Sequence, residues 1–130
     1  MNAFVFDTCF LIDLEREMKR GPGKAHQFLQ LHSSARPCLT WIIAGEFAEG
    51  FGDVSDPVCA AMLDRFDILP MDQQTANHYA VATKHLRGLN QLIGTNDLWI
   101  AAAAIAHKLP LVTNNTAHFN RVPGLSLVGY

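Results

Sequence analysis

The sequence predicts an α/β fold, a three-layer α/β/α sandwich around a mainly parallel central sheet. Short apolar runs alternate along the chain with longer segments whose apolar residues recur at helical spacing, which is typical of such sandwiches. The runs are apolar at consecutive positions, as in strands that are buried on both faces. Because the 130 residues are 49% hydrophobic and show no linker or internal repeat, residues 1–130 are expected to form a single domain.

The first half of the chain is predicted to begin with a buried strand that ends at Asp7. Ala3-Phe4-Val5-Phe6 is short, apolar and rich in residues that favour strands. The turn Gly21-Pro22-Gly23 then divides two helical segments. The elements expected here are a strand over 3–6, helices over 8–20 and 24–32, a very short strand over 37–40, and a helix over 41–49 that is capped by Thr40 and ended by Gly50.

Capping residues mark the elements of the second half. Asp56-Pro57 suits the N-cap and first position of a helix, and Asp72 and Thr95 suit the N-caps of two more. The elements expected here are a helix from Pro57, a strand over 68–69, a helix from Asp72 to about Arg87, a loop over 88–94, a helix from Asn96 to about His107, a strand over 109–113 and an edge strand over 126–128.

The charge balance excludes a protein that binds nucleic acid through a global basic field. The formal net charge is -2 and the pI is about 6.3. A polyanionic substrate would need a metal ion or a local group of cations. The candidate groups are Lys19-Arg20 with Lys24, Lys84 with Arg87, and Arg121.

The cysteines and the hydrophobicity indicate a cytoplasmic protein without a membrane span. Cys9, Cys38 and Cys59 are odd in number, have no zinc-type spacing and lie beside apolar residues, so they are expected to be small buried side chains in a reducing compartment. No uncharged apolar stretch approaches the roughly 18 residues that span a bilayer, and no signal-peptide pattern is present.

Three isolated carboxylates, Asp7, Glu46 and Asp97, interrupt apolar runs of the chain. Burial of such a charge is costly unless a cation compensates it. In parallel sheets, ligands bind at the carboxyl ends of the strands, which is where Asp7 is expected. If the fold brings the three together, they form an acidic site that suits Mg²⁺ or Mn²⁺.

Each carboxylate also has an ordinary structural explanation. Asp7 can cap the following helix, although Thr8 can take that role instead. Asp97 lies in the first turn of its predicted helix, where a negative charge gains about 0.3–1 kcal/mol from the helix dipole. Glu46 is expected in the middle of a helix, where many glutamates simply face solvent. Pattern alone leaves these alternatives open.

Several segments resemble PIN domains, and most closely the VapC-type toxin ribonucleases. The similarity runs nearly from end to end and is strongest in the last third of the chain. The segments that carry it are Val5-Phe6-Asp7-Thr8-Cys9-Phe10-Leu11-Ile12, Glu46-Phe47-Ala48-Glu49-Gly50, Ile93-Gly94-Thr95-Asn96-Asp97-Leu98-Trp99-Ile100-Ala101-Ala102, Leu111-Val112-Thr113-Asn114-Asn115 and Phe119-Asn120-Arg121-Val122-Pro123-Gly124-Leu125.

The resemblance implies roles for individual residues. Asp7, Glu46 and Asp97 match the family's acidic metal-site positions, and Thr8 matches its hydroxyl residue after the first aspartate. Thr113 and Asn115 match the polar motif that follows the fourth strand, so Asn115 is expected to join the three acids in catalysis. Many PIN domains place a further acid in this motif, whereas this chain has Asn115 and His118. Both are expected to orient water or ligate the metal, or, for His118, to be an ordinary surface residue.

The same resemblance implies an activity and partners. The expected function is Mg²⁺-dependent hydrolysis of RNA phosphodiester bonds, leaving a 5′-phosphate and a 3′-hydroxyl, by the toxin of a toxin-antitoxin pair. A homodimer is expected, as is a small antitoxin whose tail enters the acidic groove, with an arginine in the place of the metal. One alternative is a PIN domain that has lost hydrolysis and serves as a protein- or RNA-binding module.

A second alternative, a response-regulator-like signalling domain, fits the sequence less well. Such a domain needs adjacent acids after the first strand and a late lysine at a strand end, and this chain has neither. The remaining histidines show no zinc-type spacing and are expected to face solvent from helices. They are His26, His32, His78, His85 and His107.

Overall fold

The computed structural model describes residues 2–130 and contains one five-stranded sheet in which every neighbouring pair of strands is parallel. The strand order is β3-β2-β1-β4-β5. In chain order the elements are β1 (Ala3–Phe6), α1 (Thr8–Arg20), α2 (Lys24–Leu31), β2 (Arg36–Leu39), α3 (Trp41–Ala48), α4 (Pro57–Leu63), β3 (Asp67–Ile68), α5 (Gln73–Gly88), α6 (Thr95–Ala106), β4 (Leu111–Val112), α7 (Thr116–Phe119) and β5 (Leu127–Val128).

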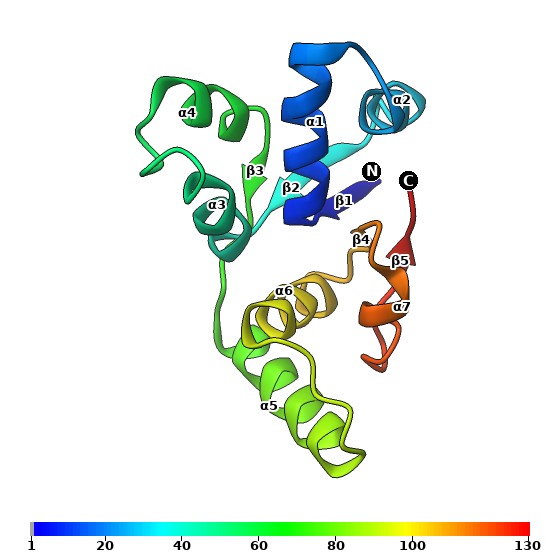
Figure 1. The fold of residues 1–130 in the computed structure, drawn as a ribbon. Helices are drawn as coiled ribbons and strands as arrows, with labels where there is room; N and C mark the ends of the chain where they lie inside the picture. The colour runs from blue at the N-terminus through cyan, green and yellow to red at the C-terminus, as the bar shows by residue number, and fades with distance from the viewer. Residues whose placement is uncertain (1) are drawn as a thin grey trace.

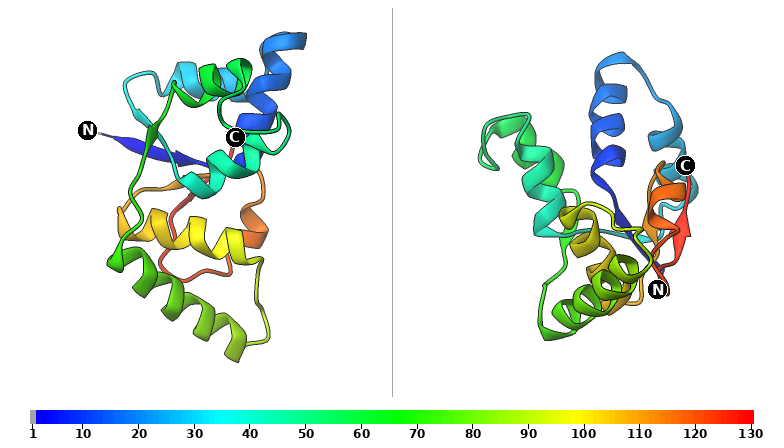
Figure 2. Two further views of the ribbon diagram at one scale, coloured as in Figure 1. Left: turned by 90° about the vertical axis from the view of Figure 1, so that its left-hand side faces the viewer. Right: turned by 60° about the horizontal axis from the view of Figure 1, so that its bottom comes forward.

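The helices lie on both sides of the sheet, which confirms the predicted three-layer α/β/α sandwich. In Figure 1, α1, α2 and α4 lie above the strands and α5 and α6 lie below them. The left-hand view of Figure 2 keeps this separation, with α5 lying beneath α6 at the bottom of the picture. None of the helices within residues 2–130 combines the length and the hydrophobicity that crossing a bilayer requires.

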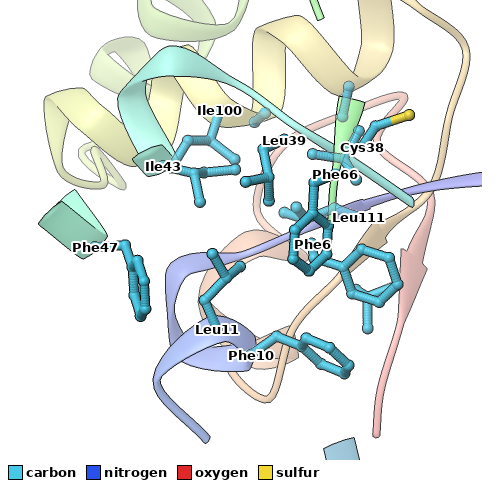
Figure 3. Packing of buried hydrophobic residues seen from close by; sticks show 14 of the residues in the cluster. Phe6, Phe10, Leu11, Cys38, Leu39, Ile43, Phe47, Phe66, Ile100 and Leu111 are labelled. Atoms are coloured by element: carbon cyan, nitrogen blue, oxygen red, sulfur yellow. The ribbon is translucent and has the colours of Figure 1, made fainter. Parts of the chain in front are cut away.

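Aromatic side chains from β1, α1 and α2 fill the core on one face of the sheet (Figure 3). The Phe6 and Phe10 rings have centroids 4.4 Å apart, and Phe28 packs edge-on against both. On the other face, Ala101 to Ala104 of α6 are fully buried, so that small side chains let this helix lie close to the strands. These two packed faces hold the ends of β1, α1 and α6 in fixed positions.

Most predicted helix starts and caps are confirmed, and the exception is the start of α6. Thr40, Asp56 and Asp72 accept hydrogen bonds from backbone N–H groups as N-caps. Thr95 is not a cap but the first residue of α6, after Gly94. Asp7, not Thr8, is the N-cap of α1, because Asp7 is the last extended residue after β1.

Other differences from prediction concern short elements and histidines. The short helix α7 was not predicted, because a four-residue helix carries too little periodicity to be recognised. The strand β3 begins one residue earlier than predicted, and β4 is shorter. His85 is exposed as predicted, whereas four histidines predicted to face solvent are half-buried, three of them because they pack against a ring or form hydrogen bonds within the fold (His26, His32 and His107). The fourth is His78.

A partly buried hydrogen-bond cluster around Glu17 joins α1 to α2. The Glu17 carboxylate accepts hydrogen bonds from the backbone N–H groups of Gly23, Ala25 and His26. Its Oε1 also lies 2.9 Å from His26 Nδ1. Burial alone would raise the pKa of Glu17, but the bonds from His26, Ala25 and Gly23 outweigh burial and lower it to about 2. The ionised form of Glu17 therefore stabilises the fold.

We expect Glu17→Gln to lower the free energy of unfolding by about 1 to 2 kcal/mol at pH 7, because a charged acceptor with several donors is lost. A lowered pKa gives a stabilisation that is complete above the ordinary glutamate range and is lost as the pH falls toward about 2. The difference between wild type and Glu17→Gln should therefore shrink between about pH 5 and pH 2, as urea unfolding at several pH values would measure.

Glu15→Gln is the matched control for Glu17→Gln. Glu15 lies on the same helix and forms an ordinary surface pair with Lys19 at 2.8 Å, of a kind that contributes about 0.3–0.5 kcal/mol. Equal effects of the two substitutions at pH 7 would contradict the role given to the Glu17 cluster.

Candidate active site

The candidate site lies where the order of the strands reverses. β2 and β3 follow β1 on one side of the sheet, and the chain then returns to place β4 on the other side of β1. Phe6 of β1 pairs with Val112 of β4, so both strands end at the same level. The next residues, Asp7 and Thr113, therefore lie side by side at the carboxyl edge, which is the usual ligand-binding place in such sheets.

Asp7 is buried and held by hydrogen bonds on both oxygens. The Thr113 hydroxyl donates to Asp7 Oδ2 at 2.8 Å, and the Thr8 backbone N–H donates to Oδ1 at 2.9 Å. Burial raises the pKa of Asp7 above its ordinary value, the bonds from Thr113 and Thr8 oppose this shift, and the negative charge of Asp97 adds to it. In the absence of a cation, an ionised Asp7 is thus an unfavourable group in this fold.

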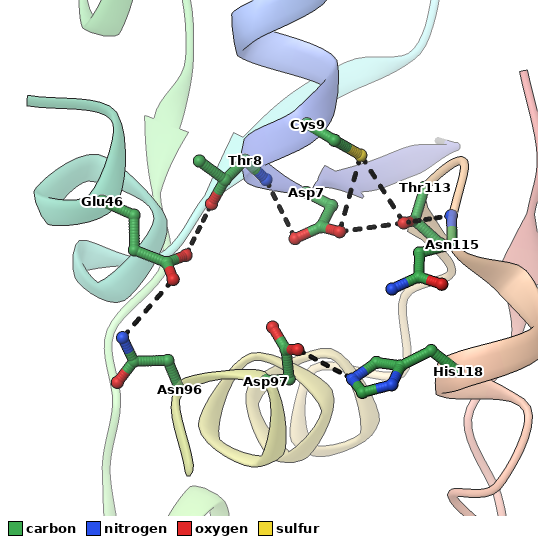
Figure 4. Close-up of polar contacts among 9 residues, drawn as sticks. All are labelled: Asp7, Thr8, Cys9, Glu46, Asn96, Asp97, Thr113, Asn115 and His118. Atoms are coloured by element: carbon green, nitrogen blue, oxygen red, sulfur yellow. Dashed lines mark hydrogen bonds and ion pairs between the residues drawn. The ribbon is translucent and has the colours of Figure 1, made fainter. Parts of the chain in front are cut away.

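Glu46 faces the site from the middle of α3 and is not simply exposed. The Thr8 hydroxyl donates to Glu46 Oε1 at 2.6 Å, and the Asn96 amide donates to Oε2 at 3.4 Å (Figure 4). Thr8 therefore serves two acids, Asp7 through its backbone and Glu46 through its side chain. The predicted supporting role of Thr8 has a geometric basis in these two contacts.

Asp97 lies in the first turn of α6 and is held by His118 of α7. His118 Nε2 is 2.8 Å from Asp97 Oδ2, and both side chains are about 70% covered, with 26% and 31% exposed. Figure 4 shows Asp97 opposite Asp7 and Glu46 across the site. The structure thus brings together all three predicted carboxylates, each with a neutral or cationic partner of its own.

A hollow of about 480 Å³ opens between these side chains. Asn115 lines the hollow as predicted, and its backbone N–H donates to the Thr113 hydroxyl at 3.0 Å. Sequence reasoning missed three polar residues at the site, although each is adjacent or nearly adjacent in sequence to a predicted one. They are Cys9 and Asn114, which line the hollow, and Asn96, which holds Glu46.

The donor set of the hollow suits a hard divalent cation. Its charged groups are carboxylates, and Asn114 and Asn115 add amide oxygens. Burial raises the pKa of the Cys9 thiol, which favours its neutral form and a weak donor role toward Asp7. Within residues 2–130, no three His, Cys, Asp or Glu side chains lie close enough to ligate one ion directly. Mg²⁺ commonly keeps several waters and uses one or two carboxylates, so this spacing is compatible with it.

The basic residues singled out in the sequence are exposed and lie outside the lining of the hollow. Arg121 lies two residues after the end of α7 and is therefore close to His118 along the chain, and its backbone N–H donates to the His118 carbonyl at 3.5 Å. The other basic groups lie on α1, α2 and α5.

A parallel sheet with three acids around a hollow beside the ends of β1 and β4 is typical of a PIN domain. The chain belongs to the PIN domain family, whose model matches residues 4–125. Ribonuclease VapC1 of Haemophilus influenzae (strain R2866) is 30% identical over 128 residues, which cover 94% of this chain and 93% of the relative. The tRNA(fMet)-specific endonuclease VapC of Salmonella typhimurium (strain LT2) is 28% identical over 132 residues, covering 98% and 97%. Within the family, the chain belongs to the VapC group.

The solved structures agree with this placement. The crystal structure of VapBC2 from Rickettsia felis, bound to a DNA fragment from its promoter, matches with a TM-score of 0.82 and 25% identity, and the match covers 98% of both chains. The resemblance to VapC-type PIN domains that was seen in the sequence is confirmed.

We expect Asp7→Asn to keep the free energy of unfolding at pH 7, without divalent cations, within about 1 kcal/mol of wild type and not below it. The raised pKa of Asp7 means that ionisation costs stability in the fold, so removing the charge is not harmful. Lowering the pH from 7 toward 4 should stabilise wild type relative to Asp7→Asn. Urea unfolding in EDTA at both pH values measures this difference.

Asp64→Asn is the control for this measurement, because Asp64 is exposed at the end of α4, outside the hollow. A marked loss of stability in Asp7→Asn at pH 7 would show that the Asp7 carboxylate supports the fold, contrary to expectation.

Proposed function

We propose that this chain is the toxin of a toxin-antitoxin pair and acts as a Mg²⁺-dependent endoribonuclease, with Mn²⁺ able to replace Mg²⁺. The observation that carries the proposal is the convergence of Asp7, Glu46 and Asp97 on one hollow at the switch point between β1 and β4. The names of the full-length relatives, ribonuclease VapC1 and tRNA(fMet)-specific endonuclease VapC, support RNA as the substrate.

In this proposal one or two of the carboxylates ligate the cation directly and the rest hold its bound waters, and neutral groups hold the carboxylates. Thr113 orients Asp7, Thr8 and Asn96 orient Glu46, and His118 orients Asp97. The cation, when bound, would supply a Lewis acid that activates water and offsets the charge developing on the phosphate.

One of the carboxylates would accept the proton of the attacking water, and Asn115 would orient that water or the phosphate from the rim of the hollow. Hydrolysis of this kind leaves a 5′-phosphate and a 3′-hydroxyl and needs no covalent intermediate.

The RNA backbone would be bound by local cations. Arg121 is the first candidate because it follows α7, the helix that carries His118. Lys84 and Arg87, and the group formed by Lys19, Arg20 and Lys24, are exposed and would extend the contact to phosphates farther from the cut. The function places the protein in the cytoplasm, where its substrate is found.

A small antitoxin would silence the toxin through the same acids. Antitoxin complexes are known for several neighbours of the fold, among them the VapBC structures from Rickettsia felis and Salmonella typhimurium. Three carboxylates in one hollow, with the pKa of Asp7 raised in part by Asp97, would attract a guanidinium as well as a metal ion. We also propose a homodimer, on the strength of the family resemblance.

A binding module without hydrolysis is the second candidate. The observation that favours it is that this chain has Asn115 and His118 in the motif where many PIN domains place a further acid, which lowers the negative charge available to a cation. Retention of the other three acids favours the enzyme.

We expect the purified protein, free of antitoxin, to cleave at least one member of a panel of tRNA, rRNA and mRNA with Mg²⁺ or Mn²⁺ and to be inactive in EDTA. Asp97→Asn and Asp7→Asn should each lower the initial rate by about 100-fold or more, since each removes a group that acts at the reacting centre. Gel analysis of end-labelled RNA measures both the rate and the 5′-phosphate product.

Asp64→Asn serves as the control and should cleave at the wild-type rate. Unchanged cleavage in both site variants would reject the proposed site. RNA binding without cleavage under any cation would favour the binding module.

A further inference from the structure

His118 stands out among the site residues because it brings an imidazole into contact with Asp97, an acid that lines the hollow. It lies on α7, and its ring packs edge-on against Phe119 with centroids 5.3 Å apart at 84°. Phe119 is only 1% exposed, so the ring rests on the core beneath it. An ionised carboxylate only accepts hydrogen bonds, so Nε2 must carry the proton that it donates to Asp97 Oδ2 at 2.8 Å.

Because of this contact, the two carboxylate oxygens of Asp97 face different partners. Oδ2 is engaged by His118, whereas Oδ1 points into the space shared with Asp7 and Glu46 (Figure 4). A single cation in the hollow can therefore use Oδ1 while His118 holds the carboxylate in place. A second cation on the Oδ2 side would meet the imidazole N–H, which is a donor and not a ligand.

The charge of the site also argues against a second cation. Two-metal sites hold ions about 3.5–4 Å apart and stabilise both with shared carboxylates. With one dication, the three ionised carboxylates leave the site with a net negative charge. With two dications, the site of the free protein would have a net positive charge. The neighbouring Asn114, Asn115 and Cys9 supply no full negative charge, since burial keeps the Cys9 thiol protonated.

We propose that His118 is a positioning residue that limits the site to one divalent cation per chain, by engaging Asp97 Oδ2 and occupying the flank where a second ion would bind. The inference rests on the metal use proposed above. It predicts that a carboxylate at position 118 would create a second cation site, whereas a neutral hydrogen-bond donor would not.

The experiment counts bound Mn²⁺ on the full chain without RNA, by titration with EPR detection of the free ion. Wild type should bind one Mn²⁺ per chain. His118→Glu, which frees Asp97 Oδ2 and adds a negative charge, should bind two. His118→Gln keeps an N–H donor for Asp97 and should bind one with affinity near wild type, whereas His118→Ala should bind one about 10–100-fold more weakly.

His78→Glu is the matched control for the added charge. His78 lines a separate hollow with Lys108 and Ser126, at the opposite end of α6 from Asp97. His78→Glu should bind one Mn²⁺ with wild-type affinity. Circular dichroism of each variant verifies that it is folded.

One Mn²⁺ in wild type and two in His118→Glu would support the inference. Two in wild type, or one in His118→Glu, would overturn it, and cleavage assays would still stand as the test of the proposed function. No binding to wild type would overturn both the inference and the metal-dependent mechanism. Equal affinities for His118→Ala and His118→Gln would remove the positioning role.

Discussion

The hydrogen bond from the Thr113 hydroxyl to Asp7 Oδ2 is the contact on which the rest of the site depends. It joins the ends of two adjacent parallel strands and satisfies a carboxylate that the fold has buried. The same hydroxyl accepts the backbone N–H of Asn115, which sets the beginning of α7. Through α7 it determines where His118 meets Asp97.

The polar contacts continue around the hollow as an open chain. From Asp7 the contacts pass through Thr8 to Glu46 and on to Asn96, which precedes Asp97 in the first turn of α6. His118 of α7 holds Asp97. Each of the three acids is held by a neighbour that is not an acid, so the acids keep their places around one hollow.

Such an arrangement is electrostatically unfavourable by itself, and this explains what the site can bind. Burial and the Asp97 charge raise the pKa of Asp7, so a positive partner in the hollow would stabilise the ionised carboxylate. A divalent cation and a guanidinium both satisfy that requirement. Under the proposed function, one cluster of acids would serve both catalysis and inhibition, because the metal and the antitoxin would compete for the same charges.

The sequence by itself determined the fold class, most helix starts and the identity of the three acids. Consecutive apolar residues, cap residues and glycine turns are local signals, and the acids stood out because they interrupt apolar runs. It left open whether Glu46 faces solvent and whether Asp7 only caps a helix. It also missed α7, Asn96 and Cys9.

Only the tertiary structure decided those questions, because each depends on contacts between residues far apart in the chain. Thr8 and Glu46 are 38 residues apart, and Asp7 and Thr113 are 106 apart. Such pairs meet through the strand order and register, which no local pattern encodes. The contact between His118 and Asp97 also joins residues that are far apart in the chain. A histidine on a four-residue helix could not be assigned a partner until the fold showed that α6 brings Asp97 to it.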